Sequence, residues 1–258
     1  MNSSPETRPS FSISPGDIYA LGNHRLACGS TSDHDLLRRL FDNDKIDLVL
    51  TDPPYGVAYV SSKIGVTEGI SKPKEIIGDH EQSDAEYRAF TKDWLLSARP
   101  YLAKKNATYI FNSDKMIFAL REGMLEAGFK FAQLLIWVKD HAVLGRMDYL
   151  PQHELIAYGW FGTHAFRRSK AKSILAFPKP GKSPHHPTQK PIGLLRELIL
   201  NSSKPNDVVF DGFMGGGSTL LACEQTKRRC FGVEIDAEHC LTVIRRWEAL
   251  TGQKAVKT

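Results

Sequence analysis

Residues 46–56 read Ile-Asp-Leu-Val-Leu-Thr-Asp-Pro-Pro-Tyr-Gly, and they decide how the rest of the chain is interpreted. The mostly apolar run 46–50 predicts a buried strand, and Asp52-Pro53-Pro54-Tyr55 follows where that strand ends. Ligand sites of α/β proteins lie beyond the carboxyl ends of such strands. An acid, two rigid prolines and an aromatic ring at this place predict a small pocket for a flat substrate with an amino group, such as a nucleobase.

The exocyclic amine of a base needs hydrogen-bond acceptors before it reacts as a nucleophile. Its lone pair is delocalised into the ring and becomes available only as the nitrogen turns tetrahedral. The Asp52 carboxylate would accept one N–H, and the Pro53 carbonyl, on a backbone stiffened by proline, would accept the other. Tyr55 would stack on the base, which is worth ~1–3 kcal/mol. The alternative is a strand end whose Asp caps a turn and whose Tyr packs in the core.

Length and composition are typical of a single α/β domain. The chain has 258 residues, of which 41% are hydrophobic and 24% are charged. We expect a flexible arm over residues 1–16 and one domain over 17–258. Without an apolar run of about eighteen residues, a soluble, cytoplasmic protein is expected. Cys28, Cys223, Cys230 and Cys240 contain no C-x-x-C pair, which indicates reduced thiols and no structural metal.

Apolar periodicity predicts strands that alternate with helices. We expect a hairpin over 17–28, strands at 107–111, 131–138 and 153–160, and helices at 33–41, 84–101, 114–127 and 192–200. Near-continuous apolar strands favour a largely parallel sheet with helices on both faces. The Gly-containing, charged stretch 57–80 predicts a mobile loop, which we interpret as a lid.

A glycine-rich turn follows the apolar stretch 207–210. It runs from Asp211 through Phe213, Gly215 and Gly217 to Ser218-Thr219, where a helix begins, so that the backbone can approach a ligand closely. No Gly-Lys-Ser/Thr follows, which argues against a nucleoside triphosphate. Glu234 ends the next apolar stretch, at a position suited to binding both hydroxyls of a ribose. The ligand would be nucleoside-like. A dinucleotide of an oxidoreductase and a purely structural turn are the alternatives.

Two further segments carry polar signals. In His-Pro-Thr-Gln-Lys-Pro, residues 186–191, Thr188 and Lys190 would lie at a helix N-terminus and bind an anion, or the segment is a simple helix cap. Residues 159–190 contain no Asp or Glu and carry a charge of +7, against +5 for the whole chain. They would bind nucleic-acid phosphates, the alternative being a solvated basic loop; the candidates for this binding are Arg167, Arg168, Lys170, Lys172, Lys179 and Lys182.

Together, the three motifs resemble the S-adenosylmethionine-dependent DNA amino-methyltransferases that modify adenine N6 or cytosine N4. The order of the motifs, catalytic before cofactor-binding, is similar to the permuted class called beta. This resemblance implies an α/β Rossmann-like methyltransferase fold with a circularly permuted motif order and a small target-recognition insertion at 159–185. It implies that Asp52, Pro53, Pro54 and Tyr55 bind and activate the amine of a flipped base. The cofactor-binding residues would be Ser30, Thr188, Lys190, Asp211, Phe213, Gly215, Gly217, Ser218, Thr219 and Glu234.

The chain departs from the usual family pattern at three positions. Gly212 and Gly216 stand where Pro and Ser are common in the cofactor turn, and Ser30 stands where relatives often have Asp. We expect weaker cofactor contacts there.

Family likeness favours adenine N6 in double-stranded DNA, because D-P-P-Y is more typical of adenine enzymes and S-P-P-Y of cytosine-N4 enzymes. Cytosine N4, an RNA or protein acceptor, an NAD-dependent oxidoreductase and a non-catalytic DNA-binding protein remain alternatives. A homodimer and a cognate restriction enzyme are partners raised by analogy alone.

Overall fold

The computed structural model describes residues 12–57, 80–142, 148–164, 166–168, 170–180 and 189–258. Most of the predicted arm and lid, and the site candidates Lys182 and Thr188, lie outside the described residues.

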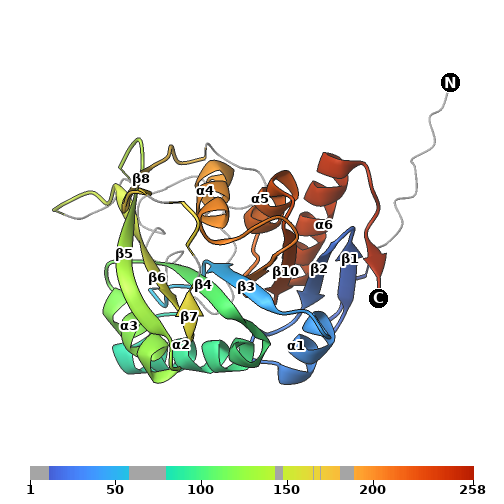
Figure 1. Ribbon diagram of the computed structural model, residues 1–258, viewed down its shortest axis with the longest axis horizontal. Helices are drawn as coiled ribbons and strands as arrows, with labels where there is room; N and C mark the ends of the chain where they lie inside the picture. Colours follow the sequence, from blue (N-terminus) through green and yellow to red (C-terminus); the bar gives the residue numbers. More distant parts are fainter. Residues whose placement is uncertain (1–11, 58–79, 143–147, 165, 169, 181–188) are drawn as a thin grey trace, which may run out of the picture.

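Parallel strands form the centre of one large sheet (Figure 1). Their order is β2 (His24–Cys28), β10 (Arg229–Glu234), β9 (Val208–Asp211), β3 (Ile46–Thr51) and β4 (Leu102–Asn112). Beyond β2, β1 (Ile18–Leu21) and β11 (Val256–Lys257) pair antiparallel. Beyond β4, β6 (His153–Trp160) and β5 (Lys130–Val138) are antiparallel, β8 (Ile174–Ala176) is parallel to β5, and β7 (Thr163–His164) lies along β4.

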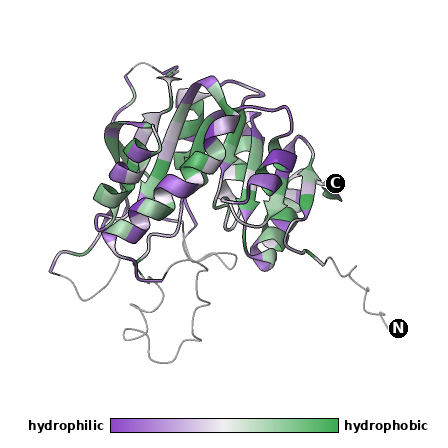
Figure 2. Ribbon diagram, turned by 90° about the horizontal axis from the view of Figure 1, so that it is seen from below, coloured by the Kyte–Doolittle hydropathy of each residue, from purple (hydrophilic) through white to green (hydrophobic). Residues whose placement is uncertain are grey.

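Helices cover both faces of this sheet (Figure 1). One layer holds α4 (Ile192–Ser202), α5 (Ser218–Thr226) and α6 (Ala237–Thr251), and the other holds α1 (His34–Phe41), α2 (Asp84–Ala98) and α3 (Ile117–Glu126). Each layer has its own buried cluster, one around Leu198 and Trp247 and one around Leu37 and Trp94. The strands are coloured mainly as apolar, whereas the helices carry both polar and apolar residues (Figure 2). The predicted largely parallel sheet with helices on both faces is confirmed.

Local sequence signals explain where the helices begin and end. Ser83 and Glu86 form a capping box at the start of α2, and Asp33 caps α1. The helix predicted over 84–101 ends at Ala98, and the short 3-10 helix η2 (Arg99–Tyr101) follows. Pro100 explains this difference, because it has no N–H to donate to the carbonyl four residues earlier and so cannot continue the α-helix, although Arg99 itself is still in the α conformation. The strand predicted at 107–111 is longer, since β4 covers 102–112.

This topology brings the two main motifs together. Asp52 follows β3 and the glycine-rich turn follows β9, and these strands are parallel neighbours with Val49 opposite Phe210. The motifs are therefore adjacent at the carboxyl edge of the sheet, although about 160 residues separate them in sequence. None of the helices in the described ranges combines the length and the apolar character needed to cross a membrane.

Candidate active site

The Asp-Pro-Pro-Tyr segment lies where β3 ends, and it turns back toward α2. Pro53 is buried, and Pro54 and Tyr55 are half-buried. Gly56 has φ +65°, and a Cβ there would lie 3.1 Å from the Gln82 side chain. The Gln82 N–H donates to the Gly56 carbonyl at 2.9 Å. This left-handed turn needs glycine and fixes how the preceding four residues face the carboxyl edge.

Both carboxylate oxygens of Asp52 have partners within the protein. The Lys190 ammonium lies 2.5 Å from Asp52 Oδ2, and the Tyr55 hydroxyl lies 2.7 Å from Oδ1. Lys190 was predicted to lie at a helix N-terminus, and it does directly precede Pro191, the N-cap of α4. Its ammonium contacts the Asp52 carboxylate, whereas the resemblance assigned Lys190 to cofactor binding.

Glu154, at the start of β6, completes this network. Its Oε2 atom is 3.1 Å from Lys190 Nζ and 3.0 Å from the Tyr55 hydroxyl, and its Oε1 atom is 2.9 Å from Lys139 Nζ. Because Tyr55 carries one hydroxyl proton, it donates to Asp52 or to Glu154 at any moment. Two carboxylates and two ammonium groups thus balance each other in a largely buried site, with Lys139 and Lys190 each 7% exposed.

Sequence reasoning gave no role to Lys139 or Glu154. The only signal was that each charged residue stands at the end of an apolar strand. Their meeting depends on the antiparallel pairing of β5 with β6, which sets Trp137 opposite Glu154. Nothing in the local sequence specifies that strand order.

Burial and neighbouring charges shift the pKa values of this network. Burial raises the pKa of Asp52, the Glu154 charge raises it further, and Lys190 opposes both. Burial alone would raise the pKa of Glu154, but Lys190 and Lys139 lower it to about 2. Burial would lower the pKa of Lys190, and the carboxylates of Asp52 and Glu154 raise it instead. Asp52 is therefore the carboxylate that takes up a proton first as the pH falls.

The glycine-rich turn lies beside this network, and Asp211 connects the two. The Thr51 hydroxyl donates to Asp211 Oδ1 at 2.7 Å, and the Phe213 N–H reaches the same oxygen at 3.1 Å. Thr219, in the first turn of α5, also hydrogen bonds the carboxylate. Burial nevertheless raises the pKa of Asp211 to about 6. Thr51 precedes Asp52 directly, so one hydrogen bond joins the two predicted sites.

Glu234 and the glycines shape the other side of the turn. The Gly215 N–H donates to Glu234 Oε2 at 2.6 Å, and the Asp236 N–H donates to Oε1 at 2.9 Å. Gly217 has φ +80° and is the N-cap of α5, where a Cβ would lie 3.0 Å from Val243. The turn therefore combines the buried Asp211 carboxylate with the Glu234 carboxylate at the end of β10. The glycines between them leave the backbone free of side chains at their own positions.

Gly212 and Gly216, which depart from the usual family pattern, have hydrogen-bond partners that the sequence did not reveal. The Thr31 hydroxyl donates to the Gly212 carbonyl, and its methyl group lies 2.9 Å from where a Gly212 Cβ would be. Arg246 of α6 donates to the Gly216 carbonyl. Ser30, which precedes Thr31, is exposed, and its hydroxyl accepts from the Ser32 N–H. Thr31 and Arg246 therefore hold the backbone at Gly212 and Gly216, the positions where weaker cofactor contacts were expected.

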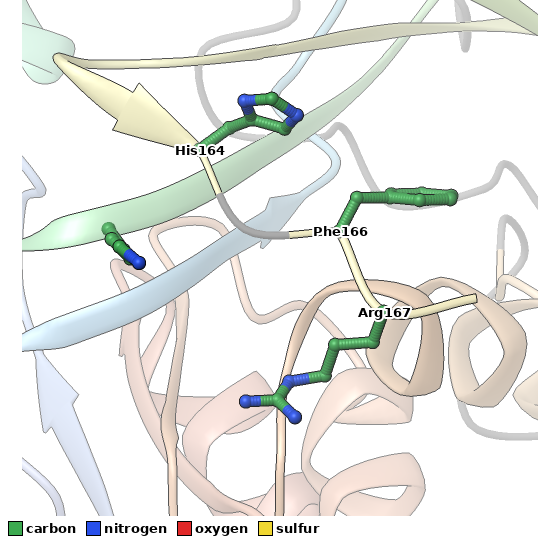
Figure 3. A pocket seen from close by; sticks show the side chains of 4 residues that line it. His164, Phe166 and Arg167 are labelled. Carbon is green, nitrogen blue, oxygen red and sulfur yellow. The ribbon is translucent and has the colours of Figure 1, made fainter. Parts of the chain in front are cut away.

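The described residues of the basic segment, 159–190, reach both ends of the central strands. At its far end, an open pocket of about 560 Å³ is lined by Lys105, His164, Phe166 and Arg167 (Figure 3). On β4, Lys105 lies five residues before Ile110, which pairs with Thr51 at the carboxyl edge. The pocket is therefore ~17 Å along the strand from that edge.

The second half of the segment reaches the carboxyl edge. β8 pairs with β5 so that Ala176 lies opposite Val138, and the Lys179 N–H donates to Asp140 Oδ1 at 2.9 Å. Lys179 is thus near Lys139, whereas Arg167 is bound through its N–H to the Asn201 carbonyl, near the far end of α4. The DNA-binding candidates within the described residues are not gathered at one place.

Comparison with known proteins agrees with this arrangement. A family model described as DNA methylase matches residues 46–245, which include the Asp52 network, the basic segment and the glycine-rich turn. The chain belongs to the N6/N4 DNA methylase family. It is therefore a DNA amino-methyltransferase, and this identification excludes the oxidoreductase reading.

Individual relatives are distant. The type II methyltransferase M2.MboI of Moraxella bovis is 25% identical over 232 residues, which cover 82% of this chain and 84% of the relative. The solved M1.HpyAVI–SAM complex is 23% identical, with a TM-score of 0.63 over 86% of this chain and 98% of that one. The cytosine-N4-specific PvuII DNA methyltransferase is 16% identical, with a TM-score of 0.68 over 86% and 85%. These structures show the same fold, which confirms the predicted methyltransferase architecture.

Proposed function

We propose that this DNA methylase transfers a methyl group from S-adenosylmethionine to the N6 amine of an adenine flipped out of double-stranded DNA. The observation that carries the proposal is the hydrogen bond from Thr51 to Asp211 at 2.7 Å. It joins the acidic Asp-Pro-Pro-Tyr pocket to the glycine-rich turn. A base in the first site and a cofactor in the second would therefore meet across neighbouring strand ends.

The residues of the turn fit S-adenosylmethionine. Glu234, 7% exposed at the end of β10, is suited to accept ribose hydroxyls, and the turn up to Gly217 lets backbone approach the ligand. The Asp211 carboxylate is buried and short of positive partners, which suits the ammonium of the methionine part. When bound, the cofactor supplies a sulfonium methyl group, which the amine nitrogen takes as the carbon–sulfur bond breaks.

The protein's own contribution is to hold the amine and take its charge. Asp52 accepts one N–H and the Pro53 carbonyl accepts the other, so that the lone pair turns toward the cofactor side of the pocket. The nitrogen becomes positive as the new bond forms, and its proton leaves toward the Asp52 carboxylate. Tyr55 contacts the base through its ring, and its hydroxyl orients Asp52 before the base binds. No covalent enzyme intermediate is needed.

Adenine is preferred to cytosine on the Asp at position 52, because D-P-P-Y is more typical of adenine enzymes. The relatives do not decide between the bases, since PvuII DNA methyltransferase is cytosine-N4-specific. Cytosine N4 is the second candidate, because the same two acceptors would serve its amine.

Contact with the DNA backbone is assigned to the cationic residues of the segment 159–185, with Lys179 at the catalytic edge. Extrusion of the base would let its amine reach Asp52. A homodimer and a cognate restriction enzyme stay predictions.

Nucleoside analysis tests this proposal directly. The protein is incubated with unmethylated genomic DNA and methyl-labelled S-adenosylmethionine, and the digested nucleosides are separated by mass. We expect labelled N6-methyladenine. Labelled N4-methylcytosine would contradict the adenine assignment while keeping the mechanism. No labelled nucleoside, with cofactor binding intact, would contradict the proposed function as a whole.

A further inference from the structure

The catalytic carboxylate is occupied before any substrate arrives. Lys190 Nζ lies 2.5 Å from Asp52 Oδ2, where the target amine would donate its N–H. An ammonium and an amine are both hydrogen-bond donors, and an amine that donates to an oxygen already bound by an ammonium weakens the contact between them. We therefore expect binding of the base to loosen the contact of Lys190 with Asp52.

A second acceptor for Lys190 is already in place. Glu154 Oε2 lies 3.1 Å from Lys190 Nζ, so the ammonium can keep a carboxylate partner without leaving the site. The Tyr55 and Phe111 rings, 5.6 Å and 5.1 Å from Nζ, line the space around it. A buried ammonium without a charged partner is strongly disfavoured, which makes this second carboxylate necessary.

Lys139 keeps Glu154 from following Lys190. It binds the other oxygen, Oε1, at 2.9 Å, and it is itself buried above the Trp137 ring at 5.2 Å. Glu154 thus has one oxygen fixed to Lys139 and one turned toward Lys190 and Tyr55. Its position does not depend on Asp52.

We propose that Glu154, anchored by Lys139, is a positioning residue that takes over the Lys190 ammonium and the Tyr55 hydroxyl when the target amine binds Asp52. The proposal rests on the proposed function of the same site. It gives this buried pair of strand-end residues a part in methyl transfer that the Asp-Pro-Pro-Tyr motif alone does not contain.

The charge of Glu154 makes the proposal testable through the pH dependence of methyl transfer. Asp52 faces Lys190, Glu154, Tyr55 and, more remotely, Asp211. Replacing Glu154 by Gln removes one of the anions near Asp52 and leaves Lys190 with Asp52 as its single carboxylate. Asp52 should then hold Lys190 more tightly and ionise at lower pH. A merely structural loss would slow the enzyme without moving its pH dependence.

The test compares Glu154→Gln with wild type and with Glu122→Gln, an exposed glutamate of α3 that binds Arg88. Single-turnover methyl transfer is measured with excess enzyme on unmethylated genomic DNA across a range of pH. Cofactor affinity and thermal unfolding show whether each variant is folded. Glu154→Asp, which keeps the charge but shortens the reach, replaces the Gln variant if that variant does not fold.

We expect Glu154→Gln to bind cofactor normally, to lose at least tenfold in rate and to move the acid limb of the pH profile to lower pH. Glu154→Asp should lose rate and keep the acid limb, and Glu122→Gln should match wild type. A wild-type rate in either Glu154 variant, or a slow Gln variant with an unmoved acid limb, overturns the inference alone. An inactive wild-type enzyme contradicts the proposed function and the inference with it.

Discussion

At the scale of single residues, the Asp211 carboxylate is buried where its ionisation is unfavourable. Asp211 is 3% exposed, and its hydrogen bonds from Thr51, Thr219 and Phe213 only partly offset its burial. Its pKa is raised from 3.8 to about 6, so ionisation favours the unfolded chain. The stability that this group contributes is fully present below pH 3.8 and is lost as the pH rises through about 6. Two pKa units correspond to roughly 3 kcal/mol.

Asp211→Asn should therefore stabilise the free protein and impair cofactor binding. At pH 8 we expect a higher melting temperature than wild type, because an uncharged amide can keep the hydrogen bonds from Thr51 and Phe213. The difference should disappear toward pH 4. Cofactor affinity, measured by calorimetry at pH 8, should fall at least tenfold since the ammonium partner is gone. A variant that is less stable than wild type at pH 8 and binds cofactor equally well would contradict this account of Asp211.

At the scale of elements, contiguous motifs were predictable and contacts across the sheet were not. The strand before Asp52, the glycine turn and the helix starts could be predicted because apolar periodicity and turn residues act locally. Lys139 and Glu154 could not, because β6 lies between β4 and β5 and is antiparallel to both, an order that no local signal specifies. Thr31 was missed for the same reason, since it contacts Gly212 across 181 residues of sequence.

Gly217 tests how the cofactor turn is joined to α5. Gly217→Ala should be destabilising for two reasons, the positive φ of +80° and a Cβ only 3.0 Å from Val243. Gly252→Ala is the matched control, with φ +72° at the end of α6 and no atom within 4 Å of the added Cβ. We expect both variants to lose ~1 kcal/mol of unfolding free energy, because alanine disfavours the left-handed conformation. Gly217→Ala should lose more than Gly252→Ala, and it alone should weaken cofactor binding. Urea unfolding would measure the stability of each variant, and calorimetry would measure its cofactor affinity. An equal loss of stability in the two variants would refute the role given to Val243.

At the scale of the whole molecule, the sheet separates two ends of the basic segment. Lys179 lies at the carboxyl edge with the network of Asp52, Lys190 and Glu154, and Arg167 lies by the pocket near the opposite end of β4. The sequence showed the charge of this segment but not its path, because the path follows from how β7 and β8 join the sheet. Its described residues contribute β7 and β8 to the sheet, and its role as a target-recognition insertion stays a prediction.

Salt dependence should separate these two ends. Each lysine that binds a phosphate adds about one to the slope of log affinity against log salt. We expect Lys179→Ala to lower that slope by about one, and Arg167→Ala to lower it less. Lys254→Ala, whose exposed side chain pairs with Glu248, is the control and should leave it unchanged. Fluorescence anisotropy with duplex DNA measures the slope, and the opposite ranking of the first two variants would contradict the placement of the DNA at the carboxyl edge.

The central claim is that the ends of two neighbouring strands have different tasks. The residues after β3 activate the amine, and the residues after β9 hold the cofactor. Asp52→Ala separates these tasks, because Lys190 keeps Glu154 as its charged partner at 3.1 Å and the turn around Asp211 is not altered. The most direct measurement is single-turnover methyl transfer by this variant, with cofactor affinity determined on the same sample. The account predicts no detectable transfer and a cofactor affinity within about threefold of wild type, well under 1 kcal/mol. Near-normal transfer would contradict it.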